Sequence, residues 1–503
     1  MSGFIKPSEF QHPGDGPSKW SLQAKAFLVV CSHRMWRGGP RSILQITAVA
    51  FVLLMLFYFV PLQFDDHYQQ ILNWSAPESS ASSDLRIVVF GSQDLLGSAP
   101  DSKHSKTSWP EHLCKQLNCR SVLSFVPPIE SLPGLTSNSL YGTEIRALEM
   151  FTEQANLTEK PALDNFYIPK QYPVPTKTPD LEAQVQKFLT MAPPKIPPRE
   201  TLWVFTFGTW ETWNLAALPR GAGEKLIDAS VSNIFTQIEL LYRRSLNPKS
   251  PAFSDFWSNV TKEDVRALTH PDPEKKPDER RMESFRVVIP QLFDITLVPG
   301  WQNRPLPSHP QSRGVQLRNA AYLTQRWNSQ VSKQIEDWRK KADTKPEGIE
   351  EEGIDVALSV PTMTSLLRYL PESLQPKQTD SNGEVIDEDI IYAPYPRRLG
   401  LQSALVSSVL DAMTEEEMQR SGLKDSRGRG SMPADGAMRF FDVWTPCIAD
   451  HRAIAGIDTP HTSGECDVPN DHLFYDGFTF GERAKEELAK HTSAQIREQL
   501  FAS

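Results

Sequence analysis

Five runs of apolar, β-branched or aromatic residues follow one another along the chain after residue 84. Continuous apolar runs are typical of strands that are covered on both faces, whereas alternating runs indicate one exposed face. The runs are LRIVVFG (85–91), SVLSFVP (121–127), LWVFTFG (202–208), FRVVIPQLFD (285–294) and MRFFDVW (438–444). They predict five strands of one mostly parallel sheet.

Helical patterns lie between these runs. They are SWPEHLCKQL (108–117), EKLIDASVSNIFTQIELLYRR (224–244), VQLRNAAYLTQRWNSQVSKQIEDWRKK (315–341) and AKEELAKHTSAQIREQLF (484–501). In the first of them, Ser108 is a suitable N-cap and Pro110 falls in the first turn. Because strands alternate with helices, we expect an α/β fold.

Three stretches interrupt this alternation. Residues 160–199 are rich in proline, residues 246–283 are polar and charged, and residues 342–388 are largely acidic and polar. We interpret them as surface insertions of a single domain that occupies residues 85–503.

An apolar segment precedes this domain. ILQITAVAFVLLMLFYFVPL, residues 43–62, contains no charged residue, and a helix of about 20 apolar residues spans a bilayer. A cleaved signal peptide is the alternative, but the leading polar region is about 42 residues long and no small-residue cleavage site follows. The segment is also too long and too uniformly apolar for a buried core helix.

The charges beside the apolar segment predict its orientation. Arginines precede it and aspartates follow it: Arg34, Arg37, Arg41, Asp65 and Asp66. By the positive-inside rule, residues 1–42 form a cytoplasmic tail and residues 63–84 a stem on the other side. We therefore expect a single-pass protein whose main domain is lumenal or extracellular, in the Golgi, the endoplasmic reticulum or the plasma membrane.

Sequons and cysteines agree with a secretory compartment. Three Asn-x-Ser/Thr sites follow the apolar segment, at Asn73, Asn156 and Asn259. Four of the five cysteines lie on the same side: Cys114, Cys119, Cys447 and Cys466. Two disulfides are expected in an oxidising compartment, with free buried thiols as the alternative. Of the three pairings, we favour Cys114–Cys119 and Cys447–Cys466, because each closes a short loop.

The charge balance excludes one class of partner. The chain carries 53 basic and 62 acidic residues, a net charge of -9, which argues against a general nucleic-acid binder. The sequence contains no phosphate-binding loop, no dinucleotide fingerprint and no zinc-ligand spacing, so we expect neither a metal nor a cofactor. The oligomeric state stays open.

Candidate chemistry falls where the predicted strands end, because ligands of open parallel sheets bind beyond the carboxyl ends of the strands. Four stretches qualify: Gly91-Ser92-Gln93-Asp94, FGTWETWN (207–214), DITLVPGWQ (294–302) and NDHLFYDGFTFGERAKEELA (470–489). Their layout resembles the SGNH/GDSL hydrolase superfamily. That family places a Gly-Asp-Ser turn after the first strand, a Gly-x-Asn-Asp turn after the third, and Asp-x-x-His before the last helix.

The resemblance covers residues 85–503 and implies a three-layer sandwich around a five-stranded, mostly parallel sheet. Within the superfamily, FGTWETWN and LFDITLVPGW are most similar to long fungal membrane-anchored GDSL-like proteins.

The family's catalytic residues are replaced in the first and last of these turns. With Gly91 aligned, the family's serine falls on Gln93 and its preceding aspartate on Ser92. With Asp476 aligned, the family's histidine falls on Thr479. Acyl transfer by serine needs a general base, and neither replacement provides the nucleophile or the base.

The oxyanion groups are altered as well. With Gly208 aligned, the family's asparagine falls on Trp210 and its aspartate on Glu211. Gly142 is a loose candidate for the second oxyanion contributor. Asp94 and Glu211 are candidates for a carboxylate pair at the rim.

A rescued triad is conceivable. If the turn slips by one residue, Ser92 becomes the nucleophile and His472 the base, with Asp471 or Asp476 to orient it; we favour Ser92, His472 and Asp476. The alternatives are a turn serine, a loop histidine and a capping carboxylate.

Aromatic residues are dense at the strand ends: Trp210, Trp213, Trp301 and Tyr475. They suit sugar rings, and the alternative is that they pack the loops onto the sheet. Two functions compete. The first is an esterase or acyltransferase of glycan or lipid esters. The second is an inactive pseudohydrolase that binds a glycan or supports a membrane glycan-processing complex.

Overall fold

A computed structural model describes the globular part of the chain. The described residues are 84–99, 107–128, 132–157, 165–247, 249–256, 284–308, 311–343, 395–433, 436–448 and 466–501. The predicted tail, the apolar segment 43–62 and the stem up to residue 83 lie outside them, as do the sequons Asn73 and Asn259. Of the helices in the described ranges, none is long and apolar enough to cross a membrane.

A five-stranded parallel sheet forms the centre of the domain, as predicted. Its strands are β1 (Leu85–Gly91), β2 (Ser121–Ser124), β3 (Glu200–Thr206), β4 (Ser284–Pro290) and β5 (Arg397–Ser403). The strand order is β2-β1-β3-β4-β5. In a doubly wound sheet of this order, the switch point lies between β1 and β3, and ligands bind beyond it.

The prediction of the fifth strand is wrong. MRFFDVW (438–444) forms no sheet strand and makes only an isolated bridge, between Asp442 and His472. Its Phe441 is 75% exposed, so the run is not covered on both faces. The fifth strand is RRLGLQS, β5, whose charged start and central Gly400 hide the strand pattern.

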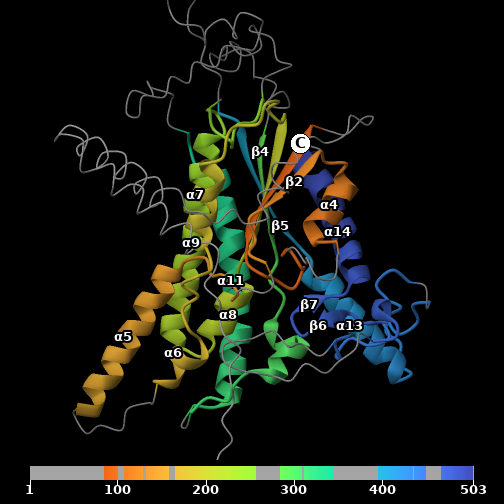
Figure 1. Ribbon diagram of the computed structural model, residues 1–503. Coiled ribbons are helices and arrows are strands. Elements are labelled where there is room, and N and C mark those ends of the chain that lie inside the picture. The colour runs from red at the N-terminus through yellow and green to blue at the C-terminus, as the bar shows by residue number, and fades with distance from the viewer. Residues whose placement is uncertain are drawn as a thin grey trace, which may run out of the picture. The chain divides into compact units, whose positions relative to one another are not determined.

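Helices cover both faces of the sheet (Figure 1). One face is covered by α7 (Leu181–Leu189), α9 (Arg220–Arg244) and α11 (Arg313–Arg339). The other is covered by α4 (Trp109–Leu117) and α14 (Glu482–Ile496), which pack against each other. The four predicted helices are therefore confirmed, and Ser108 is the N-cap of α4.

The remaining elements lie mostly beyond the carboxyl ends of the strands. They are α5 (Asn138–Leu157), α6 (Tyr167–Gln171), α8 (Thr209–Leu215), η2 (Ile295–Leu297), η3 (Pro299–Asn303), α13 (Val406–Arg420), η5 (Pro469–Asp471), β6 (Phe474–Asp476), β7 (Thr479–Phe480) and η6 (Arg497–Phe501). The sequon residue Asn156 belongs to α5.

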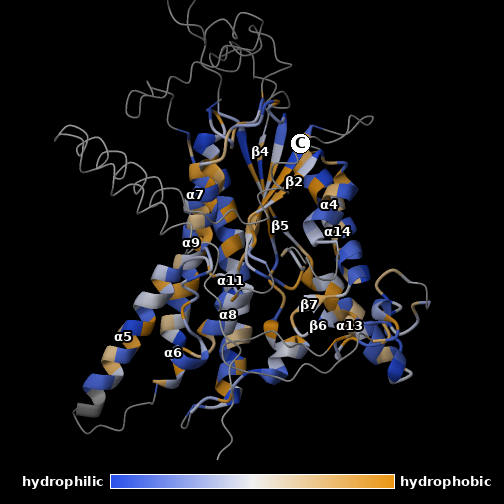
Figure 2. Ribbon diagram, in the orientation of Figure 1, coloured by the Kyte–Doolittle hydropathy of each residue, from blue (hydrophilic) through white to orange (hydrophobic). Residues whose placement is uncertain are grey.

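Stacked aromatic rings form the core on the α7–α9–α11 face. Phe90, Trp203 and Phe285 follow one another across β1, β3 and β4, with centroids 6.3 and 5.5 Å apart. Phe188 of α7 and Trp338 of α11 pack on this row edge to face. Hydrophobic residues gather in the sheet and on the inner helix faces (Figure 2). Burial of each such side chain contributes about 1.5–3 kcal/mol.

The proline-rich stretch 160–199 contributes to the core as well as to the surface. It contains α7, whose Leu181, Val185 and Phe188 are fully buried. The helix begins after Asp180, whose carboxylate accepts the backbone N–H of Ala183 at 3.1 Å. The stretch is therefore not only a surface insertion. The other two predicted insertions lie largely outside the described ranges.

Both favoured cysteine pairs are present. Cys114 pairs with Cys119, and Cys447 pairs with Cys466, with Cα–Cα distances of 4.9 and 5.0 Å. The first joins the end of α4 to the approach of β2, and the second fixes the region before β6.

Candidate functional site

The turn after β1 is held tightly from two sides. A Cβ at Gly91 would lie 2.0 Å from Oγ1 of Thr206, so only glycine fits beside β3. The side-chain amide of Gln184, on α7, accepts from Gly91 N at 3.0 Å and donates to Gly91 O at 2.8 Å. The predicted turn is therefore fixed at the switch point by residues that the motif comparison did not include.

Ser92 is fully buried in this turn. Its backbone N–H donates to Thr206 O at 3.3 Å, and its Oγ has no hydrogen-bond partner among the described residues. Nδ1 of His472 lies 2.9 Å from Thr445 O. The structure therefore does not join the serine to the histidine of the predicted triad.

Asp476, the third member, has a local partner. Its Oδ1 accepts the backbone N–H of Phe478 at 2.8 Å, which closes the turn between β6 and β7. Thr479 pairs with Asp476 across this hairpin. The hairpin docks on the first turn, because Phe480 N donates to Leu95 O at 2.8 Å. The structure thus brings the predicted C-terminal stretch to the β1 turn, as the layout of the motifs predicts.

The turn after β3 carries a buried indole, that of Trp210, which we call the plug. Gly208 has φ +120°, and a Cβ there would meet the Trp327 indole at 2.7 Å. Glycine is therefore required both by the backbone conformation and by the lack of space. Two residues later, Trp210 is 2% exposed and its Nε1 donates to Gln93 O. Its ring packs on Phe478 with centroids 5.0 Å apart. The indole therefore bridges the two turns that flank the switch point.

The predicted carboxylate pair binds two different loops. Glu211 is buried and accepts from Thr136 N at 2.6 Å and Gly208 N at 2.8 Å. Burial raises the pKa of Glu211, although these donors oppose the shift. Asp94 accepts from the backbone N–H and the hydroxyl of Ser98. Each carboxylate thus has a structural role.

Gly142 does not lie on an oxyanion turn. It lies inside α5 and faces Val174. Helical geometry uses its N–H in the backbone ladder, so the loose assignment from sequence is wrong.

The predicted aromatic residues pack against one another. Trp213 lies 5.5 Å from Trp301 and 5.2 Å from Phe478, measured between ring centroids. All three rings are buried, as is Tyr475. These side chains are therefore buried by packing of the loops onto the sheet, which is the alternative to sugar binding considered above.

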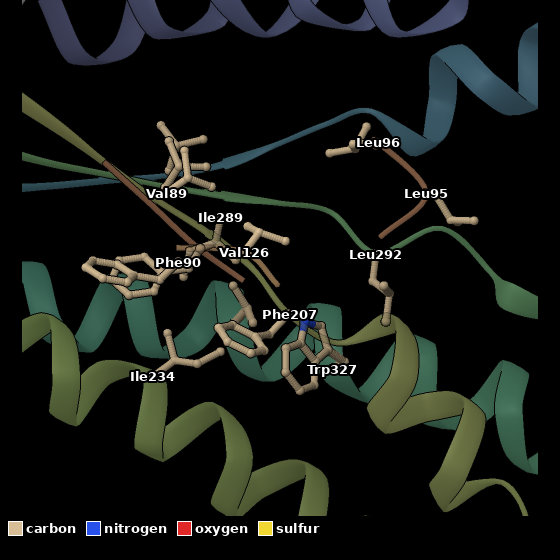
Figure 3. Close-up of a cluster of buried hydrophobic side chains, with 14 of the residues drawn as sticks. Val89, Phe90, Leu95, Leu96, Val126, Phe207, Ile234, Ile289, Leu292 and Trp327 are labelled. Carbon is tan, nitrogen blue, oxygen red and sulfur yellow. The ribbon is translucent and has the colours of Figure 1, made fainter. Parts of the chain in front are cut away.

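An apolar hollow opens beside the plug, at the carboxyl ends of β3, β4 and β5. We call it the edge pocket. Its walls include Leu95, Leu96, Leu292, Phe293, Val409 and Phe480. Figure 3 shows Leu95, Leu96 and Leu292 near the ends of the strands. Thr206 also lines it, and the Thr206 hydroxyl is buried without a hydrogen-bond partner in the part of the chain that the structure describes.

In comparisons with known proteins, no family model matches the sequence, and no curated protein matches it.

Proposed function

We propose that this chain is a catalytically inactive relative of the SGNH/GDSL hydrolases that binds, without cleaving, the apolar part of a glycan or lipid ester. In this proposal residues 43–62 anchor the domain in a membrane of the secretory pathway. The sheet order and the placement of the three turns at one edge support the relationship.

One observation supports inactivity above all. The crevice at the switch point, where a nucleophile would act, is bridged by Trp210, while Ser92 Oγ is buried and has no hydrogen-bond partner among the described residues. A serine without its base loses several orders of magnitude in rate. When Gly208 is aligned with the family's glycine, Trp210 also stands where the family has its oxyanion asparagine.

The edge pocket supports the ligand class. Its walls are mainly leucine, phenylalanine and valine side chains, contributed by the β1 turn, the β4 end, α13 and β7. Apolar walls with few polar groups suit an acyl chain.

A fluorophosphonate probe tests inactivity, because it labels only an activated serine. We expect the full-length protein in detergent to remain unlabelled, with no difference between wild type and Ser92→Ala. A serine esterase run in parallel controls the probe. Labelling of the wild type that disappears in Ser92→Ala would establish a serine enzyme instead.

A second assay tests the pocket. We expect the fluorescent fatty acid cis-parinaric acid to bind, and Val409→Phe to weaken binding by about tenfold or more because the larger ring fills the pocket. Leu410→Phe is the matched control, because Leu410 is the next residue of α13 and is 40% exposed. Equal binding by the two variants contradicts the assignment of the pocket, provided that circular dichroism shows both to be folded.

A further inference from the structure

Helix α5 packs on the domain by one face only. It lies at one side of the domain (Figure 1), and the described element that it contacts most is α9. Tyr141, Ile145 and Thr152 are buried on this face, and the Tyr141 hydroxyl donates to Tyr172 O at 2.8 Å. These contacts fix which side of α5 faces away from the domain.

The outward side of α5 carries an apolar stripe. An α-helix turns by about 100° per residue, so positions 140, 143, 147, 150, 151 and 154 fall within about 100° of its circumference. All are exposed, including Leu140 at 37%, Met150 at 60% and Phe151 at 64%. One exposed apolar side chain is ordinary, but several on one face mark an interaction site. The α5 stripe, as we call it, consists of Leu140, Thr143, Ala147, Met150, Phe151 and Gln154.

The charges of α5 discriminate between occupants. The helix has one arginine and three glutamates, whereas a helix that lies on a lipid surface is typically rich in lysine and arginine. Arg146 and Glu153 are exposed and flank the stripe on the same side, about 100° and 120° round the helix from Ala147. Glu149 lies about 160° from Ala147, away from the stripe. Opposite charges on one flank favour pairing with an antiparallel copy of the same helix.

We infer that the α5 stripe is a homodimer contact, in which α5 packs antiparallel on α5 of a second copy about a two-fold axis near position 149. In such a pair each flank meets the same flank of the partner, because the contact is isologous. Arg146 then faces the partner's Glu153, and Glu153 faces the partner's Arg146. The small Ala147 faces the partner's Phe151, so a large side chain meets a small one.

The remaining carboxylate also fits this register. Glu144 faces the partner's Gln154, whose amide can donate to it, so no two like charges are opposed along the stripe. Because one helix pair is a small interface, we expect a weak dimer that depends on protein concentration. The inference does not rest on the function proposed above.

Sedimentation velocity of the full-length protein in detergent tests this inference, over concentrations from about 1 to about 100 µM. We expect an equilibrium between monomer and dimer. Phe151→Asp should weaken dimerisation by about tenfold or more, because it places a charge in the centre of the contact. Ile196→Asp is the matched control and should leave dimerisation unchanged, because Ile196 lies outside α5 and is 63% exposed. Circular dichroism checks that both variants are folded.

Charge reversal tests the register. Arg146→Glu and Glu153→Arg each oppose like charges twice in the dimer, so each should weaken dimerisation by about fivefold. Combining the two reversals exchanges the charges and should restore dimerisation to within about twofold of the wild type. Both residues are exposed, so the variants should fold.

Three outcomes overturn the inference. The first is a wild type that stays monomeric at about 100 µM. The second is equal dimerisation of the wild type and Phe151→Asp, which would place the contact on another surface. The third is a double reversal that dimerises no better than the single ones, which would exclude the antiparallel register. None of these results bears on the edge pocket.

Discussion

Replacing Trp210 by phenylalanine tests whether the indole holds the two turns at the switch point. The change deprives Gln93 O of the Nε1 donor, which costs about 1–2 kcal/mol for a buried hydrogen bond. It also removes part of a ring packed on Phe478 and Trp213, which adds about 1 kcal/mol for a partial truncation. We therefore expect the free energy of unfolding to fall by about 2–3 kcal/mol.

The assay is urea unfolding followed by far-UV circular dichroism, which does not depend on tryptophan emission. Trp444→Phe is the matched control: the Trp444 indole also donates a hydrogen bond, to Glu417 at 2.6 Å, but at an exposed site. Its loss should change stability by less than about 0.5 kcal/mol. If the two variants unfold at the same urea concentration, the reasoning that the buried bridge fixes these turns is refuted.

Three further predictions concern other parts of the fold. Burial alone would raise the pKa of Glu482, but hydrogen bonds from His112 and Lys485 lower it to about 2. Because this folded-state pKa is depressed, stability should fall as the pH drops from 4.5 to about 2, and Glu482→Gln should flatten that decline in urea midpoints. Cys447→Ser opens a loop with a sequence separation of 19 and should lower the free energy of unfolding by about 3 kcal/mol; an unchanged urea midpoint contradicts this. Gly208→Ala should lower it by more than about 1 kcal/mol, because the methyl group meets Trp327 at a positive φ; a thermal midpoint equal to wild type argues against that clash.

The inner strands were predictable because they are covered on both faces. β1, β3 and β4 read as continuous apolar runs, so their burial is visible in sequence. β5 lies at the edge of the sheet and pairs only with β4, so it tolerates arginines and a glycine. MRFFDVW has the composition of a strand, but Phe441 points to solvent. Composition alone therefore does not distinguish an edge strand such as β5 from an exposed apolar segment such as residues 438–444.

The candidate site was predictable in position more than in chemistry. The turns after β1 and β3 and the β6–β7 hairpin do meet at the carboxyl ends of the strands, because parallel strands end on the same side of the sheet. The partners that shape these turns could not be found. Gln184 binds Gly91 from 93 residues away, within a stretch whose prolines indicate a loop.

The docking of the last hairpin and α14 on the first turn and α4 has a consequence for how the chain matures. His112 of α4 binds Glu482 of α14 across 370 residues, and Phe480 completes the β1 turn through Leu95. Closing so large a loop is slow, because its entropy must be lost before the contact forms. We therefore expect the apolar face of β1 that α4 and α14 cover to stay incompletely packed during synthesis until α14 has emerged. We expect this protein to depend on chaperones throughout translation, and to be unusually sensitive to premature termination near its C-terminal end.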